Sequence, residues 1–203
     1  MTNVYLFPLS NSLTMSKLTL PYHIFEDRYK EMIQDAIKNE AYVTVLFPQE
    51  SYDNEICCLG KVELLKTYPD QRLDILITGI QKVKLTQQVQ SSKPYLIYQF
   101  EEIHESLIPT EDEWHDLKII KNLILKRFKK SFELMGNFEN LKGSLCDPIT
   151  TINYATFFLL ESMEKKKEIL AASSISDKLD LLMNTFLPEC SCLSTLMAKV
   201  EKG

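Results

Sequence analysis

The chain has 203 residues, of which 45% are hydrophobic and 25% are charged, and it carries a net charge of −5. These proportions are ordinary for a globular protein, and the length suffices for one large or two small domains. The sequence contains no run of about 18 apolar residues, so we expect no membrane-spanning helix. Residues 1–10 lack the basic start and the apolar stretch of a secretory signal, which leads us to expect a cytoplasmic protein.

The distribution of charge and cysteine disfavours several classes of protein. Residues 1–105 carry ten basic and fourteen acidic side chains, and residues 106–203 carry thirteen and fourteen. Neither half has the basic surplus that binding to a phosphate backbone requires. The five cysteines are an odd number, and Cys57-Cys58 and Cys190-Ser191-Cys192 lack the spacing of a zinc site. We therefore expect reduced thiols, no metal and no cofactor.

The first half of the chain is dominated by patterns typical of strands. Its apolar runs are rich in β-branched and aromatic residues, or alternate with polar residues, and are bounded by proline and glycine. We expect six or seven strands in about the first 105 residues, at residues 3–9, 17–20, 42–47, 56–67, 72–78, 81–85 and 95–100. The second of these strands is expected to end at Pro21.

One helix is predicted among these strands, from His23 to Asn39. An apolar stripe at the helical period runs along it, formed by Phe25, Tyr29, Met32, Ile33 and Ala36. This stripe predicts a helix that packs across a sheet. Arg28 leaves the helix beside the apolar face, and we expect it to anchor a carboxylate or a carbonyl group.

Residues 61–78 are predicted to form a hairpin around Tyr68-Pro69-Asp70-Gln71. Proline presets the backbone for the second position of a turn, and aspartate bonds its neighbouring backbone. Residues 56–59 lead through Gly60 into the hairpin. Gly79 interrupts the strand pattern after the second arm, which indicates a bulge or a close backbone approach. We therefore expect both glycines to have structural roles.

After residue 106 the pattern changes to that of helices. Thr110 and Glu113 have the spacing of a capping box, and a long amphipathic helix follows that ends near Gly136. A loop is expected from there to Asp147. Three further helices are expected, with caps or first turns at Asp147-Pro148, Ser162 and Ser176-Asp177. Pro188 is expected to kink or end the last helix. We predict a strand-rich domain in residues 1–106 and a helical domain in residues 107–203.

Several short motifs follow each other in the order of one protein family. They are Pro8-Leu9, Leu20-Pro21, Ile24-Phe25-Glu26-Asp27-Arg28-Tyr29, Leu59-Gly60, Pro69-Asp70, Arg72-Leu73-Asp74-Ile75, Gly79-Ile80-Gln81, Lys167-Glu168-Ile169-Leu170 and Ser176-Asp177-Lys178-Leu179. On these residues, nearly the whole chain resembles the N-terminal substrate-recognition domain of the ATP-dependent Lon protease. Asp27 stands where proline is common in that family, and Gln71 stands where glycine is common, which leaves the geometry of the turn open.

The resemblance implies an α+β fold, with a PUA-like β pseudobarrel and one packed helix followed by an α-helical bundle subdomain. It also implies a non-enzymatic module that recognises unfolded or apolar polypeptide segments, with a protease or a chaperone as a further partner. Leu13, Met15 and Tyr52 lie in loops that mix apolar and polar residues, and they are the candidate peptide contacts. The sequence does not set the oligomeric state.

Two alternatives to this function stay open. PUA-like folds often bind RNA, although the net charge of −4 over residues 1–105 disfavours RNA as a partner. The second alternative is an enzyme. None of the five glycines forms the pair, five positions apart and followed by lysine, that a phosphate loop requires. After the two predicted domains, no residues are left for a serine–lysine protease module. We therefore expect no enzymatic activity, and neither nucleic acid nor membrane as a partner.

Overall fold

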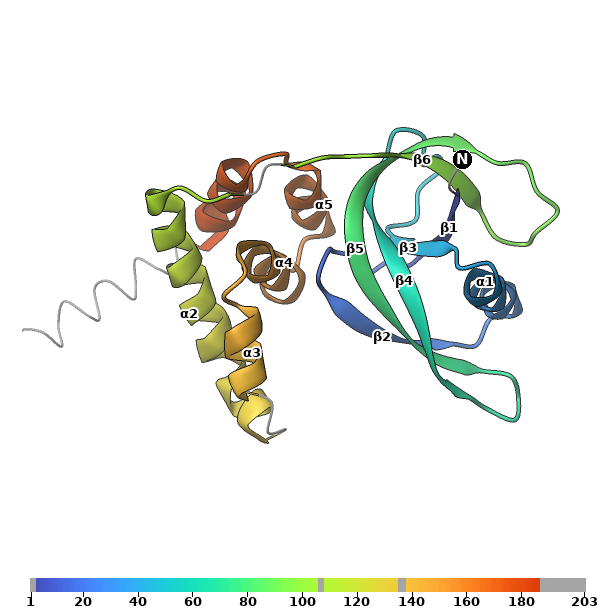
Figure 1. The fold of residues 1–203 in the computed structure, drawn as a ribbon, viewed down its shortest axis with the longest axis horizontal. Coiled ribbons are helices and arrows are strands. Elements are labelled where there is room, and N and C mark those ends of the chain that lie inside the picture. Colours follow the sequence, from blue (N-terminus) through green and yellow to red (C-terminus); the bar gives the residue numbers. More distant parts are fainter. Residues whose placement is uncertain (1–2, 106–107, 135–137, 187–203) are drawn as a thin grey trace, which may run out of the picture. The chain divides into compact units, whose positions relative to one another are not determined.

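The computed structural model describes residues 3–105, 108–134 and 138–186 (Figure 1). The chain divides into two compact units, Met1–Glu105 and Ser106–Gly203, which we call the strand unit and the helical unit. The sequence predicts the boundary between residues 106 and 107, and these two residues lie outside the described ranges. Each unit has its own apolar core, so each is described separately.

The strand unit is built on a six-stranded sheet with the order β2-β5-β4-β3-β1-β6. Because β6 also pairs with β5, the strands β5, β4, β3, β1 and β6 form a closed ring, and β2 lies outside the ring on β5. The strands are β1 (Asn3–Pro8), β2 (Thr19–Ile24), β3 (Tyr42–Leu46), β4 (Ile56–Thr67), β5 (Leu73–Gln88) and β6 (Ile97–Glu102). The predicted α+β class is confirmed, whereas the PUA-like description of the ring stays a prediction.

The first strand occupies an interior position in the sheet, between β3 and β6. β1 pairs in parallel with β3 and antiparallel with β6. Val4, Tyr5, Leu6 and Phe7 are all buried. A strand that is covered on both faces has a continuous apolar run instead of alternation, so burial explains the pattern that predicts this strand.

The second strand and the first helix meet later in the chain than the sequence pattern predicts. The predicted strand ends at Pro21 and the predicted helix begins at His23, but β2 runs to Ile24 and α1 spans Asp27–Lys38. Proline lacks a backbone N–H, and an edge strand such as β2 accommodates it because its outer side needs no donor. Phe25 therefore precedes the helix, and its side chain is 64% exposed instead of packed.

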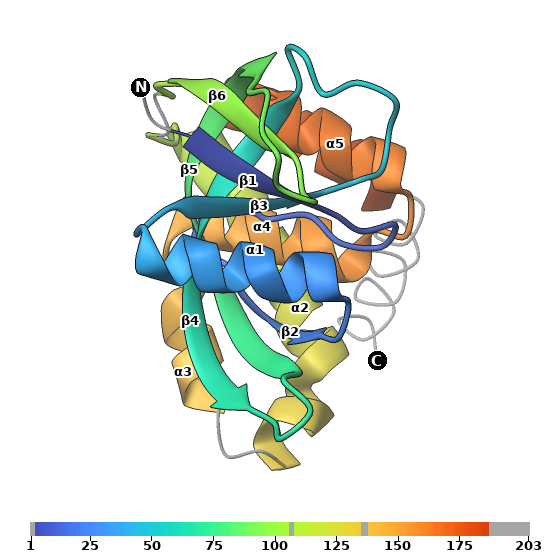
Figure 2. The same ribbon diagram turned by 90° about the vertical axis from the view of Figure 1, so that its right-hand side faces the viewer.

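The helix α1 packs one face against the sheet, as Figure 2 shows. Its buried side chains are Tyr29, Met32, Ile33 and Ala36. The ring centroid of Tyr29 lies 4.6 Å from that of Phe7 in β1. These side chains share one core cluster with residues of β1, β3 and β5. Apart from Phe25, the apolar stripe predicted for this helix is confirmed.

The two longest strands, β4 and β5, form a hairpin that extends past α1 in Figure 2. The strands predicted at residues 72–78 and 81–85 form one strand, β5, which runs through Gly79. The irregularity expected at this glycine is confirmed as a shift in the pairing register, since Leu59 pairs with Gln81 and Gly60 pairs with Gly79. In the turn that joins the strands, Gln71 has a φ of 66°, a left-handed conformation that glycine adopts more readily.

The helical unit consists of helices packed around a second apolar core. They are α2 (Glu111–Leu134), α3 (Phe138–Ser144), α4 (Pro148–Leu159), α5 (Met163–Ala171) and a helix over residues 175–186. Within the described ranges, no helix is long and apolar enough to cross a membrane.

Local hydrogen bonds begin three of these helices at the predicted residues. The Thr110 backbone N donates to Glu113 Oε2 at 2.7 Å, and the Glu113 backbone N donates to Thr110 Oγ1 at 3.4 Å, which completes a capping box. The Asp147 carboxylate accepts a hydrogen bond from the backbone N of Thr150 at 2.8 Å. The hydroxyl group of Ser162 caps α5 in the same manner.

Two parts of the helical unit differ from the sequence prediction. The expected loop before Asp147 contains the helix α3. Leu141 of this helix is buried in the core, and its burial offsets the low helix propensity of Gly143. The last helix begins at residue 175, where the backbone N of Asp177 donates to Ser174 Oγ at 3.1 Å. The expected kink at Pro188 lies outside the described residues.

Candidate functional site

The three residues predicted to contact a peptide lie inside the strand unit. Leu13, Met15 and Tyr52 are 3%, 1% and 3% exposed. The segment that carries the first two is fixed to the sheet, since the Thr14 backbone N donates to Val45 O at 2.9 Å. A side chain inside the core is not available to a partner in this structure. The expectation that these three side chains lie in exposed loops is therefore not met in this structure.

The two predicted structural glycines lie where the structure has no space for a side chain. A Cβ atom on Gly79 would lie 1.9 Å from the carbonyl oxygen of Met15. A Cβ atom on Gly60 would lie 2.7 Å from the carbonyl oxygen of Val43 and 2.4 Å from the side chain of Ile77. Both glycines thus permit a close backbone approach between segments that are distant in the sequence.

The remaining predicted structural residues lie in the first turn of α1 or just before it. Tyr29 is buried and contacts the core. Arg28 Nε donates to Glu26 Oε2 at 2.9 Å, and its guanidinium lies 4.4 Å from the Tyr29 ring centroid. Arg28 therefore binds a carboxylate, at the surface and close in the sequence. Phe25 is exposed, so we assign it to the surface and not to the core.

Exposed apolar side chains of the strand unit provide a candidate binding surface. The large apolar residues that are at least 36% exposed are Phe25, Ile37, Phe47, Leu64, Leu65 and Ile80. Leu64 and Leu65 are consecutive residues of β4, and they are 45% and 53% exposed. Consecutive strand residues normally point to opposite faces, but the β4–β5 pairing shifts register between Leu64 and Lys66. Both leucines are exposed beside this irregularity, near the end of the hairpin.

A cluster of polar side chains lies near the same end of the hairpin. His23 Nδ1 lies 2.6 Å from Asp74 Oδ1, and the Tyr68 hydroxyl donates to Asp74 Oδ2 at 2.6 Å. An Arg72 guanidinium nitrogen lies 3.5 Å from His23 Nε2. Lys66 Nζ lies 4.3 Å from the Tyr68 ring centroid. The cluster thus connects β2, β5 and the turn.

The hydrogen bonds of this cluster fix the charge of its central carboxylate. The Tyr68 hydroxyl and then the His23 ring hold the pKa of Asp74 below its ordinary value. The same bond to the carboxylate raises the pKa of Tyr68. At neutral pH the Asp74 carboxylate is therefore ionised and the Tyr68 hydroxyl is protonated, which matches the hydrogen bond from the hydroxyl to the carboxylate.

A histidine beside a carboxylate also occurs in acyl-transfer sites, where the second ring nitrogen faces a serine, cysteine or threonine nucleophile. The second ring nitrogen of His23 faces Arg72 instead. Among the residues that the structure describes, no three His, Cys, Asp or Glu side chains are grouped to hold a metal ion. Sequence reasoning missed the approach of His23 and Asp74 because 51 positions separate them and only the β2–β5 register joins them.

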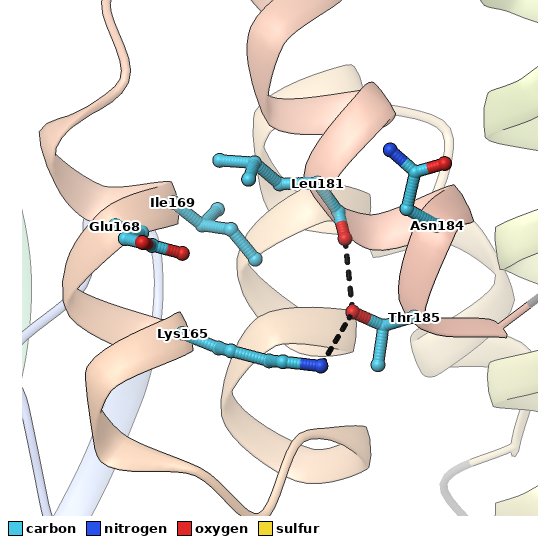
Figure 3. Close-up of a pocket in the computed structure, with 6 residues that line it drawn as sticks. All are labelled: Lys165, Glu168, Ile169, Leu181, Asn184 and Thr185. Carbon is cyan, nitrogen blue, oxygen red and sulfur yellow. Dashed lines mark hydrogen bonds between the residues drawn. The ribbon is translucent and has the colours of Figure 1, made fainter.

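A small cavity of about 150 Å³ lies in the helical unit (Figure 3). Its lining is formed by Lys165, Glu168, Ile169, Leu181, Asn184 and Thr185. Lys165 Nζ donates to Thr185 Oγ1 at 3.4 Å, and that hydroxyl donates to the carbonyl oxygen of Leu181 at 3.0 Å. The cavity is smaller than the range of about 300–1,000 Å³ that is typical of small-molecule sites, so the hairpin surface is the stronger candidate.

A strand ring with one packed helix, followed by a helical unit, is a fold shared with N-terminal domains of Lon proteases. The N-terminal domain of the Mycobacterium avium complex Lon protease is similar with a TM-score of 0.70 and 12% identity, over 90% of this chain and 97% of that one. A Lon N-terminal domain protein from Xanthomonas campestris is similar with a TM-score of 0.67 and 14% identity, over 91% and 98%.

The family follows from the sequence match. The model of the ATP-dependent protease La (LON) substrate-binding domain matches residues 3–185, so the chain belongs to this family. Comparison with curated proteins gives no match. The resemblance found in the short motifs is therefore confirmed.

Proposed function

We propose that this protein is a non-enzymatic module that recognises unfolded or apolar polypeptide segments, and that the strand unit provides most of the contact. The observation that carries the proposal is the match to a substrate-binding domain of a protease over residues 3–185. The exposed Leu64 and Leu65 support the location, because apolar side chains grouped on a surface favour contact with other apolar groups.

The ion pairs of the strand unit argue against RNA as the partner. At least five of its ten basic side chains form ion pairs with acidic groups of the same unit, namely Arg28, Lys30, Arg72, Lys82 and Lys93. The Lys82 and Glu105 side chains are 6% and 12% exposed, so this pair is also shielded from a ligand. Cations that already have carboxylate partners contribute less to the neutralisation of a phosphate backbone.

The absence of enzymatic activity belongs to the same proposal. The geometry around His23 supports it, because the second ring nitrogen faces Arg72 and not a nucleophile. Purified protein is expected to hydrolyse neither ATP nor casein. Turnover of either substrate that follows the protein through successive chromatographic steps would contradict this expectation.

The decisive experiment compares two labelled ligands by fluorescence anisotropy at low and high salt. One ligand is a reduced and carboxymethylated protein, which stays unfolded, and the other is a single-stranded RNA. Apolar contacts depend little on salt, whereas phosphate contacts weaken steeply with it. We expect binding to the unfolded protein that persists at high salt, and no such binding to its native, disulfide-bonded form. RNA binding without polypeptide binding would overturn the proposal.

The proposal includes a cytoplasmic location and the transfer of bound polypeptide to a protease or a chaperone. A pull-down from the native cell extract tests this part. A protease or chaperone that is retained by the wild-type protein at stoichiometric amounts would support transfer. Retention of unfolded polypeptide alone would limit the protein to binding.

A further inference from the structure

The outer part of β4 has a strand partner on one side alone. β5 pairs with β4 along almost its full length, up to Thr67. On the other side, β3 pairs with β4 at a single position, Val43 with Gly60. From Lys61 to Thr67, no described strand pairs with that side of β4, and we call this stretch the β4 edge. The hairpin of Figure 2 shows β4 with β5 on one side of it.

Unpaired backbone groups at the β4 edge define what can bind there. In a strand, every second residue directs its N–H and C=O groups to the same side, so an unpaired side presents donors and acceptors in alternation. An extended polypeptide satisfies both kinds of group along its length. The side chains of the edge are accessible as well, because all of its residues except Val62 are exposed.

The second free edge of the sheet lies on β2, and it is less suited to pairing. Pro21 in the middle of β2 has no N–H to donate. The exposed side chains of β2 are Thr19, Pro21 and His23, and His23 is held by Asp74. The β4 edge contains no proline and carries the exposed Leu64 and Leu65. Of the two edges, the β4 edge therefore offers both a continuous backbone and apolar contacts.

Charges next to the leucines indicate the composition of the ligand. Lys61 and Lys66 stand at the two sides of the leucines, and neither forms an ion pair in the described part of the structure. Glu63 is the one acidic residue of the edge, so the edge has a net positive charge. Acidic residues that flank an apolar segment would complement these lysines. The register shift at Leu65 and the two lysines also oppose unlimited strand pairing.

From these observations, the geometry points to strand addition: the β4 edge binds an extended polypeptide segment with apolar residues at its centre and acidic residues at its ends. The added strand pairs with the backbone of β4, and its apolar side chains contact Leu64 and Leu65. This inference rests on the proposed function and specifies where and how the polypeptide binds.

The first test replaces the two leucines and compares the variant with a matched control. In the double variant Leu64→Lys/Leu65→Lys, the affinity for the unfolded polypeptide is expected to fall by about tenfold or more, since central apolar contacts carry most of an interface's energy. Ile80→Lys is the control, because Ile80 is as exposed as Leu64, at 45%, but lies outside the β4 edge. An equal loss in both variants, or in neither, would overturn the inference. Circular dichroism verifies that both variants fold.

The second test examines the backbone of the ligand. Two labelled peptides of one sequence, with an apolar centre and acidic ends, carry N-methyl groups on alternate amides in opposite frames. Strand addition uses the N–H groups of one frame, so we expect one peptide to lose about tenfold in affinity or more and the other to bind like the unmethylated peptide. Equal affinities of the two methylated peptides would overturn strand addition, because the peptides differ in frame alone.

Separate outcomes identify which proposal fails. If the unfolded polypeptide binds and the leucine variant binds equally well, then the proposed function stands and the β4 edge is not the site. If no polypeptide binds to the wild-type protein, both proposals fall. If the wild-type chain forms dimers that the leucine variant does not form, the edge pairs with a second copy, which overturns a foreign segment as its ligand.

Discussion

The strand unit and the helical unit differ in how far apart along the sequence the residues lie that define their elements. In the helical unit, four helices begin at side chains that bond the backbone three residues later, at Thr110, Asp147, Ser162 and Ser174. In the strand unit, β1 pairs with β3 and β6, which follow it by tens of residues. The starts of these four helices are thus set by local contacts, whereas the strands are set by pairing between distant segments.

The glycines show the consequence of this difference. Gly79 contacts the backbone of Met15, and Gly60 contacts the backbone of Val43, so both support long-range contacts. At Gly143 in α3, a Cβ atom would have no heavy atom within 4 Å beyond its chain neighbours and the nearby backbone of its own helix. The same kind of residue is therefore a steric requirement in one unit and an open surface position in the other. Substitutions that exploit this contrast test it directly.

The largest effect is expected for Gly79→Ala. The new Cβ atom would overlap the Met15 carbonyl oxygen, which requires a backbone shift, and overpacking of this kind costs about 3 kcal/mol. Gly143→Ala is the matched control, and it should stabilise the helical unit by about 0.5–1 kcal/mol because alanine has the higher helix propensity. Urea unfolding measures the first change by circular dichroism and the second by the fluorescence of Trp114. Changes of equal sign would contradict the contrast between the units.

A smaller effect is expected for removal of a helix cap. Asp147→Ala eliminates the acceptor of the Thr150 backbone N–H at the start of α4, and loss of a cap costs about 1 kcal/mol. Asp180→Ala changes the same residue type at an exposed position inside the helix of residues 175–186, and it should be nearly neutral. The unfolding midpoint reported by Trp114 fluorescence compares the two. If Asp180→Ala is the more harmful change, the capping bond does not determine where α4 begins.

A modest gain is expected in the turn of the long hairpin. Gln71 has a φ of 66°, and a left-handed conformation costs a residue with a side chain about 1–2 kcal/mol. Glycine avoids this cost but loses more conformational entropy on folding, so Gln71→Gly should stabilise the strand unit by about 0.5–1 kcal/mol. Gln81→Gly, a substitution of the same type inside β5, is the control and should destabilise it. The melting temperatures of the two variants should therefore move in opposite directions.

The smallest expected effect is a loss of stability of the strand unit at acidic pH. The folded-state pKa of Asp74 is lowered, so this group contributes stability above its unfolded value of 3.8, and the contribution is lost as the pH falls through the folded pKa. The wild-type unit should therefore lose more stability between pH 6 and pH 3 than Asp74→Asn does. Thermal unfolding over this pH range measures the difference. Parallel pH profiles would show that the carboxylate contributes nothing.

Local patterns in the sequence predict much of the fold. The capping box at Thr110, the cap at Asp147 and the apolar face of α1 follow from residues within one or two helical turns of each other. The close approach at Gly60 and Gly79 also follows, because a glycine inside a strand typically marks a position where another segment leaves no room for a side chain. These features depend on the chemistry of neighbouring residues, which a single sequence contains.

The candidate site is less predictable, because it depends on which segments meet. Leu13, Met15 and Tyr52 have the composition of a surface loop, but the bond from Thr14 to Val45 holds the loop of the first two in the core. Leu64 and Leu65 have the composition of core residues, but β3 begins at Tyr42 and runs antiparallel to β4, so it does not reach them. The first outcome depends on the contact of this loop with β3, and the second depends on the register of β4 with its two neighbours.

The closure of the strand ring has a consequence for protein synthesis. β1 leaves the ribosome before the other strands of the ring, yet one of its two partners, β6, begins at Ile97. At about 10 residues per second, roughly ten seconds separate the appearance of the two strands. During this interval the apolar run from Val4 to Phe7 has no complete binding site in its own chain. The nascent protein itself thus displays, for a time, an extended apolar segment of the kind that molecular chaperones hold.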